Sequence, residues 1–458
     1  MTENPSAESW WLLLTVCLGA FIAPLGMASV NVAIPALASE LAANAVLVSW
    51  IPTAVLVANI VFMLPAGKLA DIWGRKRVFQ LGICLNALAG LGAFGASSIE
   101  WVLLMRFCQG LGSAMMFATS MALLISVFPA HKRGLPLGVN AACIYLGLTL
   151  APALGGWVTQ WLGWRYVFLL PMPLVVIVLG FIHWRVPGEW HSQEPSRFDW
   201  RGALVFALWA LALVTGLTGL PDPRHLLALV VSFVLLGVFI VMQARSPSPL
   251  IRVQMFRESR VFSMSLGTAS LMYASSYPLG FMLSLYLQYV RGYSAADAGQ
   301  LLLVQAFAMA CVAPFAGKLS DYFPARWLAS AGCGCTLAGF YVLSGIDAQT
   351  EAPVIGAGLL LVGVGFGFFS SPNNHVVMHS ARASEVGVAA ATLNLARVTG
   401  NLVGMSLVNL LIYWNLGNVA MSAELAAPLL MTFHGALQLA LVFLAAATLL
   451  SLLRGRAR

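Results

Sequence analysis

Long apolar runs, separated by short polar segments, fill the chain from residue 11 to residue 453. Each run is close to the roughly 20 residues that an α-helix needs to cross the hydrocarbon core of a bilayer. We therefore predict an all-α polytopic membrane protein with fourteen spanning helices. These helices are expected at residues 11–33, 46–66, 78–96, 101–125, 137–158, 166–184, 203–220, 226–243, 261–286, 299–316, 327–346, 353–370, 387–413 and 427–453.

The composition agrees with this pattern: of 458 residues, 60% are hydrophobic and 9% charged, and the mean hydropathy is +0.88. One soluble core cannot bury so much apolar surface, which excludes an ordinary cytosolic enzyme. The sequence has no H-E-x-x-H or G-x-S-x-G motif, and its seven cysteines lie in apolar runs without a C-x-x-C pair. We expect no enzymatic activity, no metal and no cofactor. A receptor is also disfavoured, because no polar stretch is long enough for a soluble signalling domain.

The 24 Lys and Arg residues outnumber the 16 Asp and Glu residues, which gives a net charge of +8. Most basic residues fall in alternate loops, whereas Arg165, Arg224 and Arg291 fall in the loops of the other side. By the positive-inside rule, this bias predicts an even number of helices in an inner (plasma) membrane, with both termini cytoplasmic. The polar segment Met1–Ser9 does not resemble a signal peptide, so the first helix is expected to stay in the membrane. Lipids are expected partners and nucleic acid is not.

An internal repeat divides the chain. The sequence GKLAD at Gly67–Asp71 recurs as GKLSD at Gly317–Asp321, 250 residues later and on the same predicted side of the membrane. Parallel repeats of this kind are typical of alternating-access transporters. We predict an N-terminal six-helix bundle at residues 11–186, a linker with two extra helices at 187–260 and a C-terminal six-helix bundle at 261–453.

The segment GKLADIWGRKR at residues 67–77 resembles the loop signature of the major facilitator superfamily. The resemblance implies the fold of that family and a conformational latch in this loop, formed with Asp71 and Arg75. In physical terms, Gly67 allows close helix packing, and Asp71 is expected to accept hydrogen bonds at a helix N-terminus.

The chain also resembles the fourteen-helix drug/proton antiporter branch of that family, in RFCQGLG at residues 106–112 and GLTLAPALGG at 147–156. The second segment resembles the antiporter signature. Gly147, Pro152 and Gly155 are expected to give a kink and a groove of small residues where the two bundles touch. The resemblance implies export of small amphipathic molecules, such as drugs or metabolites, in exchange for protons.

One departure leaves an alternative open. In LGMASVNVAIP at residues 25–35, Gly26 stands where the family pattern has an acidic residue, and all 16 acidic residues are expected in loops or at helix ends. Proton-coupling groups usually lie at membrane depth. The alternative is therefore a facilitator or importer of a small metabolite such as a vitamin, uncoupled or coupled differently.

Two arginines fall inside predicted helices, where a lone cation is costly unless it finds partners or faces a cavity. Arg106 and Arg397 are predicted to act in coupling or gating. The alternative for Arg106 is that it reaches the interface, and the alternative for Arg397 is a structural bond to helix-end carbonyls.

Polar or large side chains within apolar helices are candidates for the substrate cavity, although bonding between helices explains a single one equally well. The candidates are Asn31, Trp50, Asn59, Met115, Tyr145, Tyr273, Tyr277, Gln305 and Asn394. The expected partners are a small-molecule substrate and protons, and the protein is expected to be a monomer.

Overall fold

The computed structural model describes residues 7–129, 134–191, 198–218, 223–247, 249–320, 322–380, 386–417, 419–420 and 423–455. Asp321, the last residue of the second GKLSD copy, and residues 219–220 of the predicted seventh span lie outside these residues.

All regular elements of the described residues are helices. They are α1 (Ala7–Glu40), α2 (Ala45–Trp73), α3 (Arg75–Phe94), α4 (Ile99–Val127), α5 (Gly134–Trp161), α6 (Trp164–Val167), α7 (Met172–Arg185), α8 (Trp200–Thr218), α9 (Pro223–Arg245), α10 (Gln254–Glu258), α11 (Arg260–Leu285), the π-helical turn η2 (Tyr286–Val290), α12 (Ala295–Leu319), α13 (Ala325–Ser344), α14 (Ala352–His379), α15 (Val386–Asn415), the 3₁₀ turn η3 (Ala423–Leu425) and α16 (Ala426–Leu453).

Each predicted span coincides with a helical segment, and the sixth coincides with Trp164–Arg185, which contains a short turn. The region predicted as one helix at 166–184 is divided into α6 and α7. Pro171 and Pro173 lack the backbone N–H that a continuous helix would use, so the chain turns before α7 begins.

Thirteen of the described helical segments are long and apolar enough to cross a membrane. α11 is not among them although it has 26 residues, because seven of these are Ser or Thr. It contacts α1, α14, α15 and α16, so protein rather than lipid surrounds much of its surface. A helix in that position can tolerate polar side chains that a lipid-facing helix cannot.

Side-chain caps set the beginnings of several helices. Asn44 accepts a hydrogen bond from the backbone N–H of Leu47 at 2.8 Å, which caps α2. Ser98 and Ser294 cap α4 and α12 in the same way. Asn and Ser are favoured at this position because their oxygens satisfy backbone donors that have no partner within the helix.

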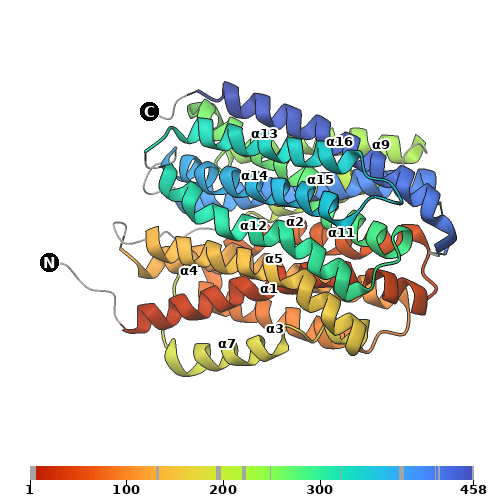
Figure 1. The fold of residues 1–458 in the computed structure, drawn as a ribbon. Coiled ribbons are helices and arrows are strands. Elements are labelled where there is room, and N and C mark those ends of the chain that lie inside the picture. Colours follow the sequence, from red (N-terminus) through yellow and green to blue (C-terminus); the bar gives the residue numbers. More distant parts are fainter. Residues whose placement is uncertain are drawn as a thin grey trace.

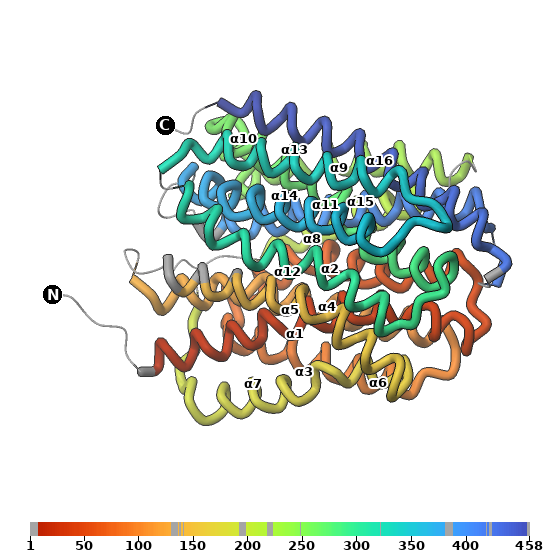
Figure 2. The backbone as a smooth tube through the Cα atoms, in the orientation of Figure 1, coloured from red at the N-terminus to blue at the C-terminus, as the bar shows by residue number. Residues whose placement is uncertain are grey.

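The long helices run roughly along one common direction (Figure 1). The N-terminal half, α1–α7, lies in the lower part of the view, and the C-terminal half, α11–α16, in the upper part. α1 begins and α16 ends at the same end of the molecule, which we call the terminus end. Figure 2 shows the short helix α10 near the terminus end and α6 near the opposite end.

The halves repeat each other's packing. α3 and α13 have the same length and start 250 residues apart. A Cβ at Gly82 of α3 would lie 2.7 Å from the carbonyl oxygen of Gly112 in α4, and one at Gly332 of α13 would lie 2.6 Å from that of Gly365 in α14. Only glycine permits such close approach, so small residues hold the same helix pair together in both halves.

Two pairs of helices make the most extensive contacts between the halves, α5 with α12 and α2 with α15. The inserted helices lie beside the second pair: α8 contacts α2, α15 and α9. α9 is largely exposed on its remaining surface, with side chains such as Leu227 and Phe233 more than half exposed. This apolar exposure fits contact with lipid.

Candidate transport site

Arg106 is buried in the N-terminal half, and only 1% of its surface is accessible. Its Nη1 donates to the side-chain oxygen of Gln109 at 2.9 Å and to the carbonyl oxygen of Gly26 at 3.3 Å. Its Nε donates to the carbonyl oxygen of Ile51 at 3.4 Å, while Nη2 is buried without a partner. Arg106 therefore ties α4 to α1 and α2, and it does not reach the membrane interface.

Arg397 lies in the C-terminal half, eleven residues into α15 and half-buried. It donates to the side-chain oxygens of Asn374 in α14 and of Asn394, the latter at 3.3 Å. Its guanidinium carbon lies 5.4 Å from the ring centre of Tyr273. Its Nε is buried without a partner. Amide side chains and an aromatic ring hold this cation, not the helix-end carbonyls of the structural alternative.

Two tyrosines of α11 interact with the two arginines, one with each. Tyr273 contacts Arg397, and Tyr277, one helical turn further, lies within electrostatic range of Arg106. Tyr145 of α5 is in turn within electrostatic range of Tyr273. The structure thus brings together predicted residues from both halves into one group, which we call the arginine–tyrosine cluster: Arg106, Tyr145, Tyr273, Tyr277 and Arg397.

Part of this cluster is partly exposed. Tyr145, Tyr273, Tyr277 and Arg397 are half-buried, although they lie near the middles of helices. Met27, in the middle of α1, is half-buried as well. Partly accessible aromatic and apolar side chains around a few polar groups are typical of small-molecule sites.

The described acidic side chains all lie in loops or within the end turns of helices. This agrees with the sequence analysis for that part of the chain. Two interior cations are therefore held by neutral groups, without an interior carboxylate among the described residues. Gly26 contributes a carbonyl oxygen to Arg106, and a Cβ at this position would point to Pro171 at 3.4 Å.

Hydrogen bonds join the two halves toward the end opposite the termini. Ser284 donates to the carbonyl oxygen of Asn31 at 2.9 Å, and Gln288 to that of Val32 at 3.0 Å. Tyr289 donates to the carbonyl oxygen of Pro35 at 3.3 Å. These bonds connect the last turns of α1 with α11 and η2, so the halves are closed against each other at the opposite end.

The antiporter-like segment of α5 contacts both halves. A Cβ at Gly156 would lie 2.3 Å from the carbonyl oxygen of Ala295, and one at Gly299 would lie 2.2 Å from that of Pro152. Small residues therefore allow α5 and α12 to cross almost in backbone contact. Gly147 and Gly155 instead pack against α1 of their own half. Of the three residues predicted to form a groove between the bundles, only Pro152 therefore meets the other half.

The signature loop between α2 and α3 is held by an ion pair. Nη2 of Arg75 donates to Asp71 at 2.8 Å, and its Nη1 donates to the carbonyl oxygen of Ala122 at 3.2 Å and to Ser126 in α4. A Cβ at Gly67 would meet Ala118 only at 3.8 Å. Close packing is thus not what requires this glycine, and that expectation was wrong.

The N-terminus of α3 is capped by a residue that the sequence analysis missed. Glu189, from the segment after α7, accepts hydrogen bonds from the backbone N–H groups of Lys76 at 2.8 Å and Arg77 at 3.2 Å. The carbonyl oxygen of Trp190 accepts from the N–H of Arg75 at 2.8 Å. Asp71 was expected in this role, but it binds the Arg75 side chain instead. A Glu preceding Trp in a linker gives no sequence signal for such a distant contact.

The remaining cavity candidates are dispersed. Met115 lies against Gly82 of α3, at the contact between α3 and α4 and away from the cluster. The side-chain oxygens of Asn31 and Asn59 are buried without partners. Trp50 and Gln305 are half-buried in α2 and α12. Asn394 does belong beside the cluster, since it accepts from Arg397.

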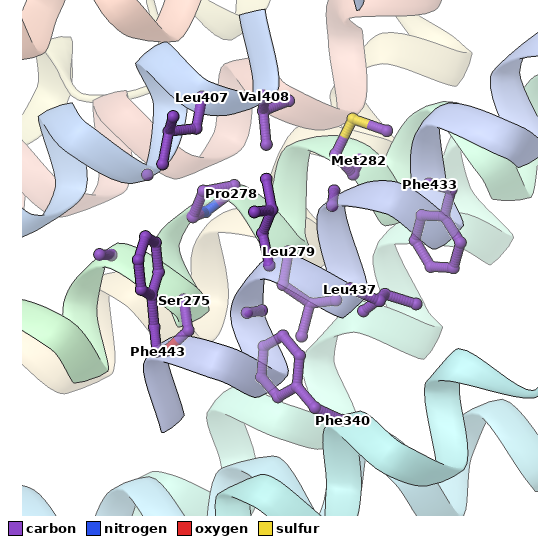
Figure 3. Close-up of a pocket in the computed structure, with 15 residues that line it drawn as sticks. Ser275, Pro278, Leu279, Met282, Phe340, Leu407, Val408, Phe433, Leu437 and Phe443 are labelled. Carbon is purple, nitrogen blue, oxygen red and sulfur yellow. The ribbon is translucent and has the colours of Figure 1, made fainter. Parts of the chain in front are cut away.

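A separate apolar pocket lies within the C-terminal half, among α11, α13, α15 and α16 (Figure 3). Phe340, Phe433, Leu437 and Phe443 surround it. Ser275 is its one labelled hydroxyl residue, and this hydroxyl already donates to carbonyl oxygens of its own helix at 3.0 Å. The pocket offers no polar group to orient a ligand, so we interpret it as imperfect packing.

Two six-helix halves, a small-residue crossing between them and a partly exposed polar cluster drawn from both halves are typical of a secondary transporter. The chain belongs to the Major Facilitator Superfamily, whose family model matches residues 16–405. The chain is therefore a multi-pass membrane transporter, and the proteins of this family and fold are not enzymes.

Known proteins agree with this assignment. The chain is 29% identical over 412 residues to the uncharacterized transporter YebQ of Escherichia coli (strain K12), covering 89% of this chain and 90% of that protein. It is 28% identical to the multidrug resistance protein Stp of Mycobacterium tuberculosis (strain CDC 1551 / Oshkosh), covering 91% and 78%. Its fold resembles the crystal structure of a bacterial homologue of the human lysosomal transporter Spinster, in an inward-facing and unoccupied conformation. The TM-score is 0.67, the identity 16% and the coverage 98% of both chains.

Proposed function

We propose that this protein exports small amphipathic molecules across the inner membrane in exchange for protons, by alternating access. The observation that carries the proposal is the crossing of α5 and α12, where the antiporter-like segment meets the other half at Gly156 and Pro152. The similarity to a multidrug resistance protein supports export as the direction.

The proposal assigns each half a role as a rigid body. The bundles at 11–186 and 261–453 rock against each other, and the helices of the linker at 187–260 stay beside α2 and α15. If both termini are cytoplasmic, as this proposal has them, the end closed by Ser284, Gln288 and Tyr289 faces outward, which is expected of an inward-facing state. Opening that end breaks these bonds, each of which contributes about 1 kcal/mol. The protein acts as a monomer surrounded by lipid.

Substrate-dependent proton movement tests this function directly. The protein is reconstituted into proteoliposomes that enclose a pH-sensitive dye, and a panel of aromatic cations, aromatic anions and vitamins is added. We expect at least one compound to move protons through the wild-type protein but not through an Arg106→Ala variant. Compound transport that is unchanged when the proton gradient is dissipated would contradict proton exchange.

A second candidate is a facilitator or importer of a small metabolite without proton exchange. Gly26 and the position of the described acidic side chains at helix ends favour it, since no proton-binding group is placed in the described interior. In the same proteoliposomes, labelled-substrate uptake without any proton movement would support this second candidate against the first.

A further inference from the structure

The interior of the described protein is positively charged. Arg106 and Arg397 are its two cations away from helix ends, and the described acidic side chains lie outside it. Removing a charge from water is costly and is offset only by hydrogen bonds or an opposite charge. Here neutral oxygens supply part of that compensation, and one nitrogen of each guanidinium is buried without a partner: Nη2 of Arg106 and Nε of Arg397.

These unused donors belong to one group of side chains rather than to two separate sites. Tyr273 and Tyr277 are four residues apart and so lie on one face of α11. The guanidinium of Arg397 lies 5.4 Å from the Tyr273 ring, and Tyr277 is within electrostatic range of Arg106. Tyr145, from the other half, is within electrostatic range of Tyr273. Tyr273, Tyr145 and Arg397 are half-buried, so a molecule that enters the interior can touch them.

A negatively charged group is the ligand that fits the arginine–tyrosine cluster. A carboxylate, sulfonate or phosphate accepts hydrogen bonds from guanidinium groups and cancels part of the uncompensated charge. The tyrosine rings offer flat surfaces and hydroxyl groups to an aromatic body. A cationic molecule would meet two like charges and no carboxylate among the described interior residues, which costs free energy.

We propose that the substrate is an aromatic or amphipathic anion whose acidic group binds at Arg397 within the arginine–tyrosine cluster. The proposal rests on the transport function proposed above and names its substrate class. Arg397 makes the direct contact with the anion. Arg106 is fully covered in this structure and attracts the anion without touching it, from beside Tyr277, one turn of α11 away from Tyr273. Gly26 contributes to this preference, because it binds Arg106 through its neutral carbonyl oxygen and adds no negative charge.

Three probes with the same ring system separate charge from shape: 2-naphthoate, 2-naphthamide and 2-naphthylmethylammonium. Their binding to the purified full-length protein in lipid nanodiscs is measured by calorimetry. We expect the anion to bind at least about tenfold more tightly than the amide, because a hydrogen bond between charged groups is stronger than one between neutral groups. The ammonium compound is expected to bind more weakly than the amide.

The variants separate the role of Arg397 from general disruption. Arg397→Gln keeps hydrogen-bond donors but removes the charge, and we expect it to lose the preference for the anion. Arg397→Lys keeps the charge and should retain most of the preference. Arg245→Gln, at the exposed end of α9, is the matched control and should bind like the wild type.

Each other outcome overturns the proposal. It fails if the cation binds most tightly, if the anion and the amide bind equally, if none of the three probes binds, or if Arg397→Gln keeps the preference. Its failure is distinct from failure of the transport function. If the protein moves aromatic cations in proteoliposomes, the export function stands and the proposed substrate class fails. If it binds the anion but moves no compound, the export function fails.

Discussion

The two halves of this transporter use arginine differently at the terminus end of the bundle. In the N-terminal half, Arg75 of the signature loop binds Asp71 and α4 from a partly exposed position. The residue 250 positions later is Ala325, so the second copy has no arginine there. Instead Arg454, at the end of α16, donates to the carbonyl oxygen of Ala325 at 2.7 Å and to Asn373 at 3.0 Å.

The different burial of Arg75 and Arg454 indicates which half can exchange its contacts at the terminus end. Arg454 is 1% exposed, and it also approaches Ser265 of α11 at 3.4 Å. It therefore ties α11, α13, α14 and α16 together in the interior. The N-terminal loop relies on an ion pair near the surface, and such pairs contribute little to stability. We infer a fixed C-terminal end and a loop in the N-terminal half whose contacts can be exchanged during the transport cycle.

The interior arginines differ in burial in the opposite order, since Arg106 of the N-terminal half is covered and Arg397 of the C-terminal half is half-buried. The covered arginine gives the largest predicted effect. Arg106→Ala should reduce transport at least about 100-fold, because three acceptors in α1, α2 and α4 lose a charged donor. Arg106→Lys should not restore transport, since one ammonium group cannot match the planar guanidinium. Initial transport rates in proteoliposomes, corrected for the amount of inserted protein, measure both variants.

Arg224→Ala, at the exposed start of α9, is the control for these variants and should transport at nearly the wild-type rate. Full activity of Arg106→Ala would assign Arg106 no part in transport and would remove the difference between the interior arginines.

The next largest effect concerns stability. Arg454→Ala should lower the free energy of unfolding by about 2 kcal/mol, because Asn373 and the carbonyl of Ala325 lose a buried charged partner. The midpoint of thermal unfolding in detergent, followed by size-exclusion chromatography, measures this loss. Arg75→Ala, the N-terminal counterpart, should lower the midpoint less; an equal loss in both variants would contradict the difference between the two ends.

The smallest effect concerns the loop itself. Asp71→Asn should change the unfolding midpoint little, since the pair with Arg75 contributes about 0–1 kcal/mol. It should slow transport severalfold if the loop exchanges contacts during the cycle. Ser320→Ala in the second copy, whose hydroxyl bonds only within α12, is the matched variant and should transport normally. Equal rates for Asp71→Asn and the wild type would show that the loop is only structural.

Most of the fold could be predicted from the sequence, because spanning helices are specified by apolar length and the repeat specifies two halves. The division of α6 from α7 was missed, since the apolar run continues through Pro171 and Pro173. The pairing of Glu189 with α3 and the burial of Arg454 could not be predicted either. Both depend on which helices are neighbours in space. Glu189 and Arg454 each stand in a loop-like position in the sequence, which gives no information about those neighbours.

The candidate site was predicted in part for the same reason. Arg106 and Arg397 are recognisable because charge inside an apolar run is rare. Their partners, such as the carbonyl of Gly26, are backbone groups that every residue has, so no sequence pattern marks them. Met115 was predicted to line the cavity because its side chain is large and apolar, but it lies on the face of α4 that packs against α3.

The halves meet along two seams, α2 with α15 and α5 with α12, and α8 covers only the first of them on its outer side. The seam of α2 and α15 has α8 against it, whereas the helices of the other seam expose side chains such as Leu150 and Phe307 to lipid. A molecule dissolved in the bilayer therefore meets α8 on one side of the protein and the crossing helices α5 and α12 on the other. Substrates that enter sideways from the membrane are therefore expected to pass along α5 and α12, because α8 covers the other flank.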